Sequence, residues 1–128
     1  DFCQLKSAVL GVFSYSGNVP AGEVWLNGVP LGPIPSGTSY AARRFLPVPA
    51  EGLATIGPRN TLTVRTPAIP AFAVGSFRLE LLHLDGRMLP SRVVPEILVS
   101  GDRWQAFPGE RPLVPCVPGD MRELALEF

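Results

Sequence analysis

Short runs of alternating apolar and polar residues, separated by Pro and Gly, form the main pattern of this chain. Alternation with a period of two predicts strands that are buried on one face, and frequent turns between them are typical of an all-β sandwich. No segment has the sustained apolar spacing of a helix, so we expect helix only as one turn near 49–53. The strands that this pattern predicts span residues 8–16, 23–27, 29–32, 41–48, 61–65, 76–84, 95–100, 104–107 and 124–128.

The clearest local signal is the dipeptide Asn27-Gly28, which follows the run EVWL. A type I′ turn needs positive φ at both central residues, which Asn tolerates and Gly adopts freely, so the sequence predicts a β-hairpin here. Val24 and Leu26 would then share one face of the first arm, and Trp25 would lie on the other.

Two later strands supply further core candidates by the same alternation. The dipeptide Asp85-Gly86 predicts a second hairpin turn after the strand at 76–84. The last strand, 124–128, could pair with the first. The residues of these two later strands that we expect in the core are Leu62, Val64, Phe77, Leu79 and Leu81.

Length and composition fit one soluble domain spanning residues 1–128. Hydrophobic residues make up 46% of the 128 residues and charged residues 17%, which is ordinary for a folded domain. The net charge is zero and the basic residues are scattered, which argues against nucleic acid as a partner. No apolar run approaches the roughly 18 residues of a membrane span, so no membrane partner is expected. The chain opens at Asp1 without Met, and we interpret it as a piece excised or processed from a longer protein.

Several short pieces of the chain resemble one family when they are taken together, in order and spacing. They are a V-x-L-N-G-x-x-L-G hairpin, the loop TSYAARR at 38–44, a turn and strand of the form L…G…N-x-L-x-V, and an L-x-L…D-G hairpin followed by S-x-D-x-W. This order is similar to that of the galactose-binding-like β-sandwich modules of glycoside hydrolases, and most of all to the N-terminal domain of bacterial α-L-rhamnosidases. The matching residues are Val24, Trp25, Leu26, Asn27, Gly28, Leu31, Gly32, Leu53, Gly57, Asn60, Leu62, Val64, Leu79, Leu81, Asp85, Gly86, Ser100, Asp102 and Trp104.

The resemblance implies a jelly-roll β-sandwich that acts as a non-catalytic carbohydrate-binding accessory module of a secreted or periplasmic glycoside-active enzyme. Sugars stack their C–H faces on aromatic rings, while polar side chains bond their hydroxyls. Some relatives hold calcium, which leaves a structural calcium open although no other cofactor is expected. The candidate ligand-binding residues are Trp25, Asn27, Tyr40, Arg43, Arg44, Asp102 and Trp104.

Most of these candidates also have a purely structural interpretation. Trp25 could face solvent, the opposite sheet or a neighbouring domain. Asn27 is a turn residue, Trp104 could close one end of the sandwich, and Arg43 and Arg44 could form a solvated strand face. The alternative function is a structural module that packs against a neighbouring domain or a partner subunit and binds no sugar.

Catalysis has the weakest support in the sequence. His83 is the only histidine, so a hydrolase of the Ser-His-Asp type would need it exposed beside a nucleophile, and we expect no enzyme activity. Cys3 and Cys116, the only cysteines, could form a disulfide or remain buried thiols.

Overall fold

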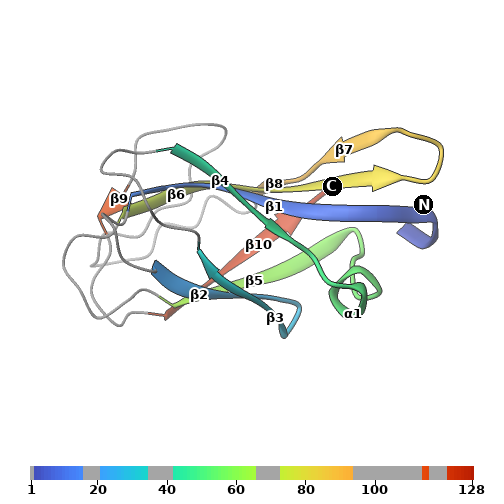
Figure 1. The fold of residues 1–128 in the computed structure, drawn as a ribbon. Coiled ribbons are helices and arrows are strands. Elements are labelled where there is room, and N and C mark those ends of the chain that lie inside the picture. Colours follow the sequence, from blue (N-terminus) through green and yellow to red (C-terminus); the bar gives the residue numbers. More distant parts are fainter. Residues whose placement is uncertain (1, 16–20, 35–41, 66–72, 94–113, 116–120) are drawn as a thin grey trace.

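Two antiparallel sheets lie face to face in the computed structural model, which describes residues 2–15, 21–34, 42–65, 73–93, 114–115 and 121–128 (Figure 1). Sheet A has the strand order β4-β1-β6-β7, with β9 also paired to β6. Its strands are β1 (Leu5–Tyr15), β4 (Ala42–Pro47), β6 (Ala73–His83), β7 (Met88–Pro90) and β9 (Val114–Pro115). Sheet B has the order β3-β2-β5-β10-β8. Its strands are β2 (Ala21–Leu26), β3 (Val29–Ile34), β5 (Arg59–Arg65), β8 (Arg92–Val93) and β10 (Met121–Glu127).

Helix is confined to two short turns in the described part of the chain. These are the 3₁₀ turn η1 (Phe2–Gln4) and the single α-helical turn α1 (Ala50–Leu53). The β-sandwich and the helical turn that the sequence predicts at 49–53 are therefore confirmed. Among the described residues, no helix has the length and apolar character that crossing a membrane requires.

The core fills the space between the two sheets, because each strand turns alternate side chains inward. The five predicted core residues are confirmed: each is at most 6% exposed, and they form one cluster with side chains from both sheets. Burial of one such side chain stabilises the fold by roughly 1.5–3 kcal/mol as an upper estimate. The cluster consists of Ala8, Leu10, Val12, Val24, Leu26, Ile34, Leu46, Ile56, Leu62, Val64, Phe77, Leu79, Leu81, Leu124 and Leu126.

Both predicted hairpins are present. At the β2–β3 turn, Asn27 has φ 49° and Gly28 has φ 83°, the positive pair that a type I′ turn requires. At the β6–β7 turn, Gly86 has φ 90° and its N–H donates to the carbonyl of His83 at 3.0 Å. The dipeptides Asn27-Gly28 and Asp85-Gly86 therefore each predicted a hairpin turn that the structure contains.

The position of the last strand differs from the expected one. Strand β10 does not pair with β1; it pairs with β5 and β8 in the opposite sheet, with Leu124 beside Leu62. The apolar pattern predicted a strand at 124–128, but a strand pattern alone does not select the partner strand. The strands at 95–100 and 104–107 lie outside the described residues.

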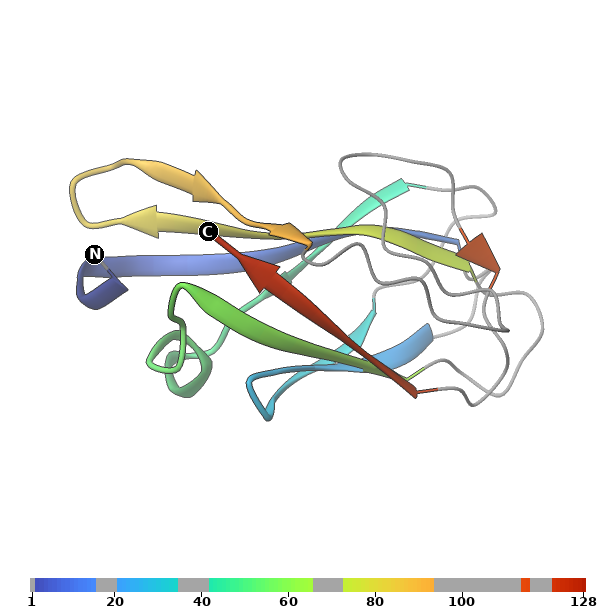
Figure 2. The same ribbon diagram turned by 180° about the vertical axis from the view of Figure 1, so that it is seen from behind.

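Prolines occupy the strands at the sheet edges. Strand β4 ends one side of sheet A and contains Pro47, and β7 on the other side contains Pro90 (Figure 2). Strand β3 at the edge of sheet B contains Pro30 and Pro33. Because Pro has no N–H to donate, these edges are poor templates for another strand.

Candidate functional site

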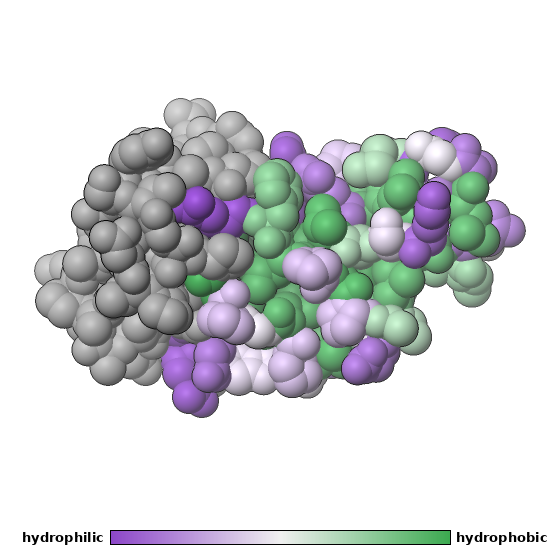
Figure 3. Space-filling model, in the orientation of Figure 1, coloured by the Kyte–Doolittle hydropathy of each residue, from purple (hydrophilic) through white to green (hydrophobic). Residues whose placement is uncertain are grey.

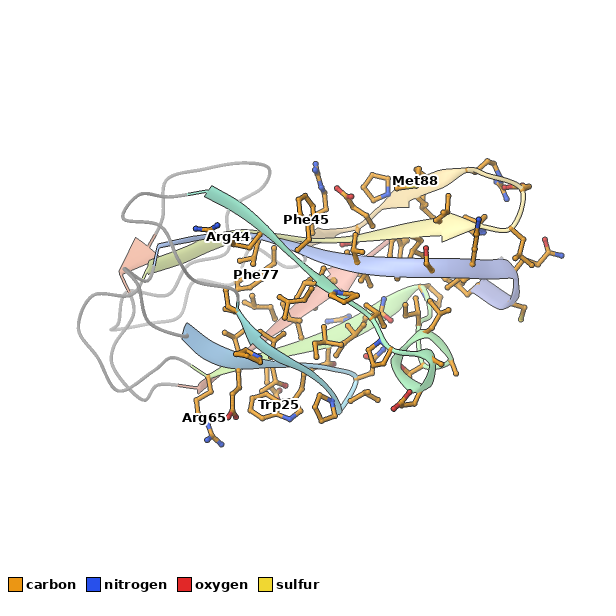
Figure 4. The ribbon with its side chains drawn as sticks, viewed as in Figure 1. Trp25, Arg44, Phe45, Arg65, Phe77 and Met88 are labelled. Atoms are coloured by element: carbon orange, nitrogen blue, oxygen red, sulfur yellow. The ribbon has the colours of Figure 1, made fainter. Side chains whose placement is uncertain are left out.

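The outer face of sheet B carries Trp25, the aromatic residue that the sequence singles out. Its neighbours along β2, Val24 and Leu26, are 1% and 0% exposed, which confirms that they share the inner face. Trp25 therefore lies on the solvent side, where it is half-buried (Figure 4). Trp25 has two cross-strand partners, Pro30 of β3 and Thr63 of β5.

A cation lies against the Trp25 ring. The guanidinium carbon of Arg65 is 5.6 Å from the ring centroid, which is cation–π distance. Arg65 also faces Glu23, with Nη1 3.8 Å from Oε2, and both side chains are about half exposed. Such an exposed pair contributes little stability, so these groups remain accessible for hydrogen bonds to a ligand.

A shallow hollow lies beside Trp25 on the same face. Thr63 is paired with Trp25 on one side and with Glu123 of β10 on the other. In the next row Thr61 faces Ala125, whose short side chain leaves a depression of about 220 Å³. The residues that line this hollow are Arg59, Thr61, Glu123, Leu124 and Ala125. The Trp25 face, as we call this surface, thus combines one aromatic ring with hydroxyl, carboxylate and guanidinium groups.

Asn27 has a structural role that is fully visible in its hydrogen bonds. Its Nδ2 donates to the Thr55 carbonyl at 3.1 Å and to Asn60 Oδ1 at 3.0 Å, and its Oδ1 accepts from the N–H of Thr61 at 2.9 Å. The amide is therefore occupied in joining the β2–β3 turn to the loop before β5. Turn geometry alone could not reveal these long-range partners.

Asn60 is the buried centre of the same network. It is 1% exposed; Oδ1 accepts from the N–H of Gly57 at 3.0 Å, and Nδ2 donates to the Gly57 carbonyl at 2.9 Å. The L-N-G and G…N pieces of the sequence thus meet at Asn27 and Asn60. Their co-occurrence has a structural cause, and neither residue is among those that line the hollow beside Trp25.

Of the other predicted ligand residues, only Arg44 has a side chain that the structure describes, and it lies away from the Trp25 face. Arg44 lies on β4 opposite Val12, on the inward-facing side of sheet A, and is half-buried rather than fully solvated (Figure 4). Arg43 belongs to β4, where only its backbone is described. Tyr40, Asp102 and Trp104 lie outside the described residues, as does Cys116, so their roles and the Cys3–Cys116 pairing stay predictions.

The outer face of sheet A has a different character, which the sequence analysis missed. Phe45 is 49% exposed and Met88 is 58% exposed, and both lie on the side of the sandwich opposite Trp25 (Figure 4). The alternation of β4 could have indicated this, because Leu46 points into the core and its neighbours Phe45 and Pro47 must therefore point outward. Hydrophobic residues also reach the surface in the middle of the view in Figure 3. Leu31 and Val48 are partly buried and pack against the core.

A second hollow, of about 360 Å³, lies between η1 and α1. Its lining is mostly apolar and offers few groups to bond sugar hydroxyls, so it is a weaker candidate site. Its residues are Phe2, Cys3, Leu5, Ala50, Leu53, Ala54 and Ile56.

The described part of the chain contains no cluster of acidic, histidine and cysteine side chains that resembles a catalytic or metal site. No group of three or more His, Cys, Asp or Glu side chains is placed to hold a metal ion there. His83 is 3% exposed at the end of β6, so it is not the exposed base that a Ser-His-Asp hydrolase would need. The pKa of Asp85 lies below its ordinary value because the N–H and the Nε of Arg87 donate to its carboxylate at 3.0 and 2.7 Å.

The comparisons with known proteins identify no relative. No protein-family model, no curated protein and no solved structure matches the chain.

Proposed function

We propose that this chain is a non-catalytic carbohydrate-binding accessory module of a glycoside-active enzyme, and that the sugar binds on the Trp25 face. The observation that carries the proposal is the position of Trp25 on the solvent side of sheet B among hydrogen-bonding side chains. A partly exposed aromatic ring flanked by polar groups can stack on the C–H face of a sugar and hydrogen-bond its hydroxyls.

The ligand would use the two parts of this face differently. One C–H face of a sugar ring packs on the accessible part of Trp25, while its hydroxyls reach Thr63 and the polar groups that line the hollow. Glu123 accepts hydrogen bonds there, and Arg59 donates them. The neutral overall charge suits an uncharged glycan better than a polyanion.

The galactose-binding-like jelly roll is part of the same proposal. Its support is the Asn27–Asn60 network, which gives a physical reason for two of the sequence pieces on which the resemblance rests. The proposal includes secretion or export to the periplasm, as the resemblance implies. It requires no cofactor, and a calcium ion enters only through the resemblance.

A glycan-array screen of the chain, in calcium and in EDTA, tests this proposal. We expect a hit that Trp25→Ala weakens at least tenfold, which corresponds to about 1.4 kcal/mol of lost binding free energy. Glu123→Gln keeps the ring and should weaken the same hit. Met88→Ala, on the opposite face, is the matched control and should bind like the wild type. Loss of the hit in EDTA would reveal a calcium requirement.

A blank array from folded protein in both buffers would contradict sugar binding. So would a hit that Trp25→Ala and Glu123→Gln leave unchanged, because the ligand would then lie elsewhere. Circular dichroism of each variant separates loss of binding from loss of fold.

A second candidate function is docking onto another protein surface. It is favoured by the exposed apolar side chains on the outer face of sheet A, including Phe45 and Met88. Exposed apolar patches on soluble proteins mark interaction sites. This function does not compete with sugar binding for space, because the two faces lie on opposite sides of the sandwich.

A further inference from the structure

We infer that the outer face of sheet A binds a second copy of this chain, face to face about a two-fold axis. The inference goes beyond sugar binding and rests on the docking function described above. It names the occupant of the face: a symmetric homodimer whose centre lies at the Arg78–Glu80 pair.

The strand register defines the face in three rows. Phe45, Gly11 and Arg78 form one row across β4, β1 and β6. The second row runs Pro47, Val9, Glu80 and Pro90, and the third contains Ser7, Leu82 and Met88. The uncharged members of these rows surround one basic and one acidic side chain. We call this surface the sheet A face.

Phe45 and Met88 give the face exposed apolar area at two of its corners. Gly11 is buried although it has no side chain, as expected where the aromatic ring of a cross-strand neighbour covers it. At the β7 end of the same face, a depression of about 230 Å³ is lined by Arg78, Glu80, Met88, Leu89 and Pro90. The face therefore offers a half-exposed aromatic ring and a hollow, both of which a second copy could contact.

The two charged side chains of the sheet A face are complementary to the same two side chains of a second copy. Arg78 Nη2 lies 2.9 Å from Glu80 Oε1, and the two side chains are 40% and 21% exposed. Among the described side chains of the three rows, these two are the charged ones, and their charges cancel. In a two-fold interface the same patch meets itself, so Arg78 of one copy can face Glu80 of the other. A partner of net positive or negative charge would gain nothing from this neutral face.

Pairing through the sheet edges is a poorer way to form the dimer. The flanking strands β4 and β7 each contain a Pro, which removes an N–H from the edge. A second copy added edge to edge would lack those hydrogen bonds. The sheet A face has no such defect, since its contacts are made by side chains.

The area of the face indicates how strongly two copies should associate. With strands about 4.8 Å apart and a rise of about 3.4 Å per residue, a face of four strands and five residues covers about 330 Å² in projection. This is below the roughly 800 Å² per partner of a standard stable interface. We therefore expect dissociation constants in the micromolar range rather than a permanent dimer.

Sedimentation equilibrium of the full chain over a micromolar to millimolar range tests the inference by charge exchange. Wild type should approach twice the 13.7 kDa mass of one chain. Arg78→Glu places Glu opposite Glu80 across the axis, and Glu80→Arg places Arg opposite Arg78, so each should weaken association about tenfold or more. The double variant Arg78→Glu with Glu80→Arg restores opposite charges and should recover the dimer. Trp25→Ala, on the other side of the sandwich, should leave association unchanged.

Two results would overturn the inference. One is a folded wild type that stays monomeric at the highest concentration; the other is a dimer that the single charge variants leave intact. Either result leaves the glycan-array outcome untouched, so failure of the dimer is distinguishable from failure of sugar binding. Met88→Lys adds a second probe, because a buried cation at the edge of the face should also weaken association.

Discussion

At the scale of single residues, Asn27 shows how one side chain serves both a turn and the packing of distant segments. Its φ of 49° is a conformation that Asn tolerates better than most residues. Its amide then joins Thr55, Asn60 and Thr61, which are 28 to 34 residues away in sequence. The turn was predictable from Asn27-Gly28, whereas the distant partners were not. These hydrogen bonds occupy the amide group that the sequence analysis named as a candidate ligand group.

Two substitutions separate the backbone role of Asn27 from its side-chain role. Asn27→Gly keeps positive φ accessible but removes the hydrogen bonds, and should lower the free energy of unfolding by roughly 1–3 kcal/mol. Asn27→Ala adds backbone strain and should cost roughly 1–2 kcal/mol more. Urea unfolding measures both values. Equal stability of the wild type and Asn27→Gly would show that the network contributes nothing.

At the scale of elements, alternation within a strand proved a dependable guide to burial. In β5, Leu62 and Val64 are 0% exposed, as the pattern TLTVR predicts. The boundaries were less dependable: β3 runs to Ile34, two residues beyond the predicted end of the strand at residue 32, because Pro33 does not end a strand at the sheet edge. Ile34 is 0% exposed, so the misplaced boundary concealed a core residue.

The β6–β7 hairpin allows a prediction about pH. Because Arg87 holds the pKa of Asp85 below its ordinary value, the charged carboxylate adds stability above that ordinary value, and this stability is lost as the pH falls through the lowered pKa. The effect should be small because the group is exposed. Arg87→Ala keeps the backbone N–H but loses the Nε bond, so the pKa of Asp85 should rise part of the way back. Carboxyl-carbon NMR titration measures both pKa values, and an ordinary pKa in the wild type would disprove the role of Arg87.

At the scale of the whole molecule, the two outer faces differ in chemistry and lie on opposite sides. The Trp25 face is aromatic and polar, whereas the sheet A face is mostly apolar with one neutralised ion pair. The sequence predicted the sandwich, both hairpins and the position of Trp25 on the strand face opposite Val24 and Leu26, since all follow from local turns and alternation. It could not predict that β10 pairs with β5, nor that Phe45 and Met88 share a face, because both depend on the order of strands in each sheet.

The proposed function depends on a sugar binding on the Trp25 face, and an NMR titration of the ¹⁵N-labelled chain tests this claim. D-galactose, L-rhamnose and the strongest glycan from the array would be the probes, and Trp25→Phe would assign the Trp25 indole N–H signal. We expect this signal to shift in a saturable way, together with amides of β2, β5 and β10. If the Trp25 indole and these amides stay unmoved, or if the shifts gather on sheet A, the claim is contradicted.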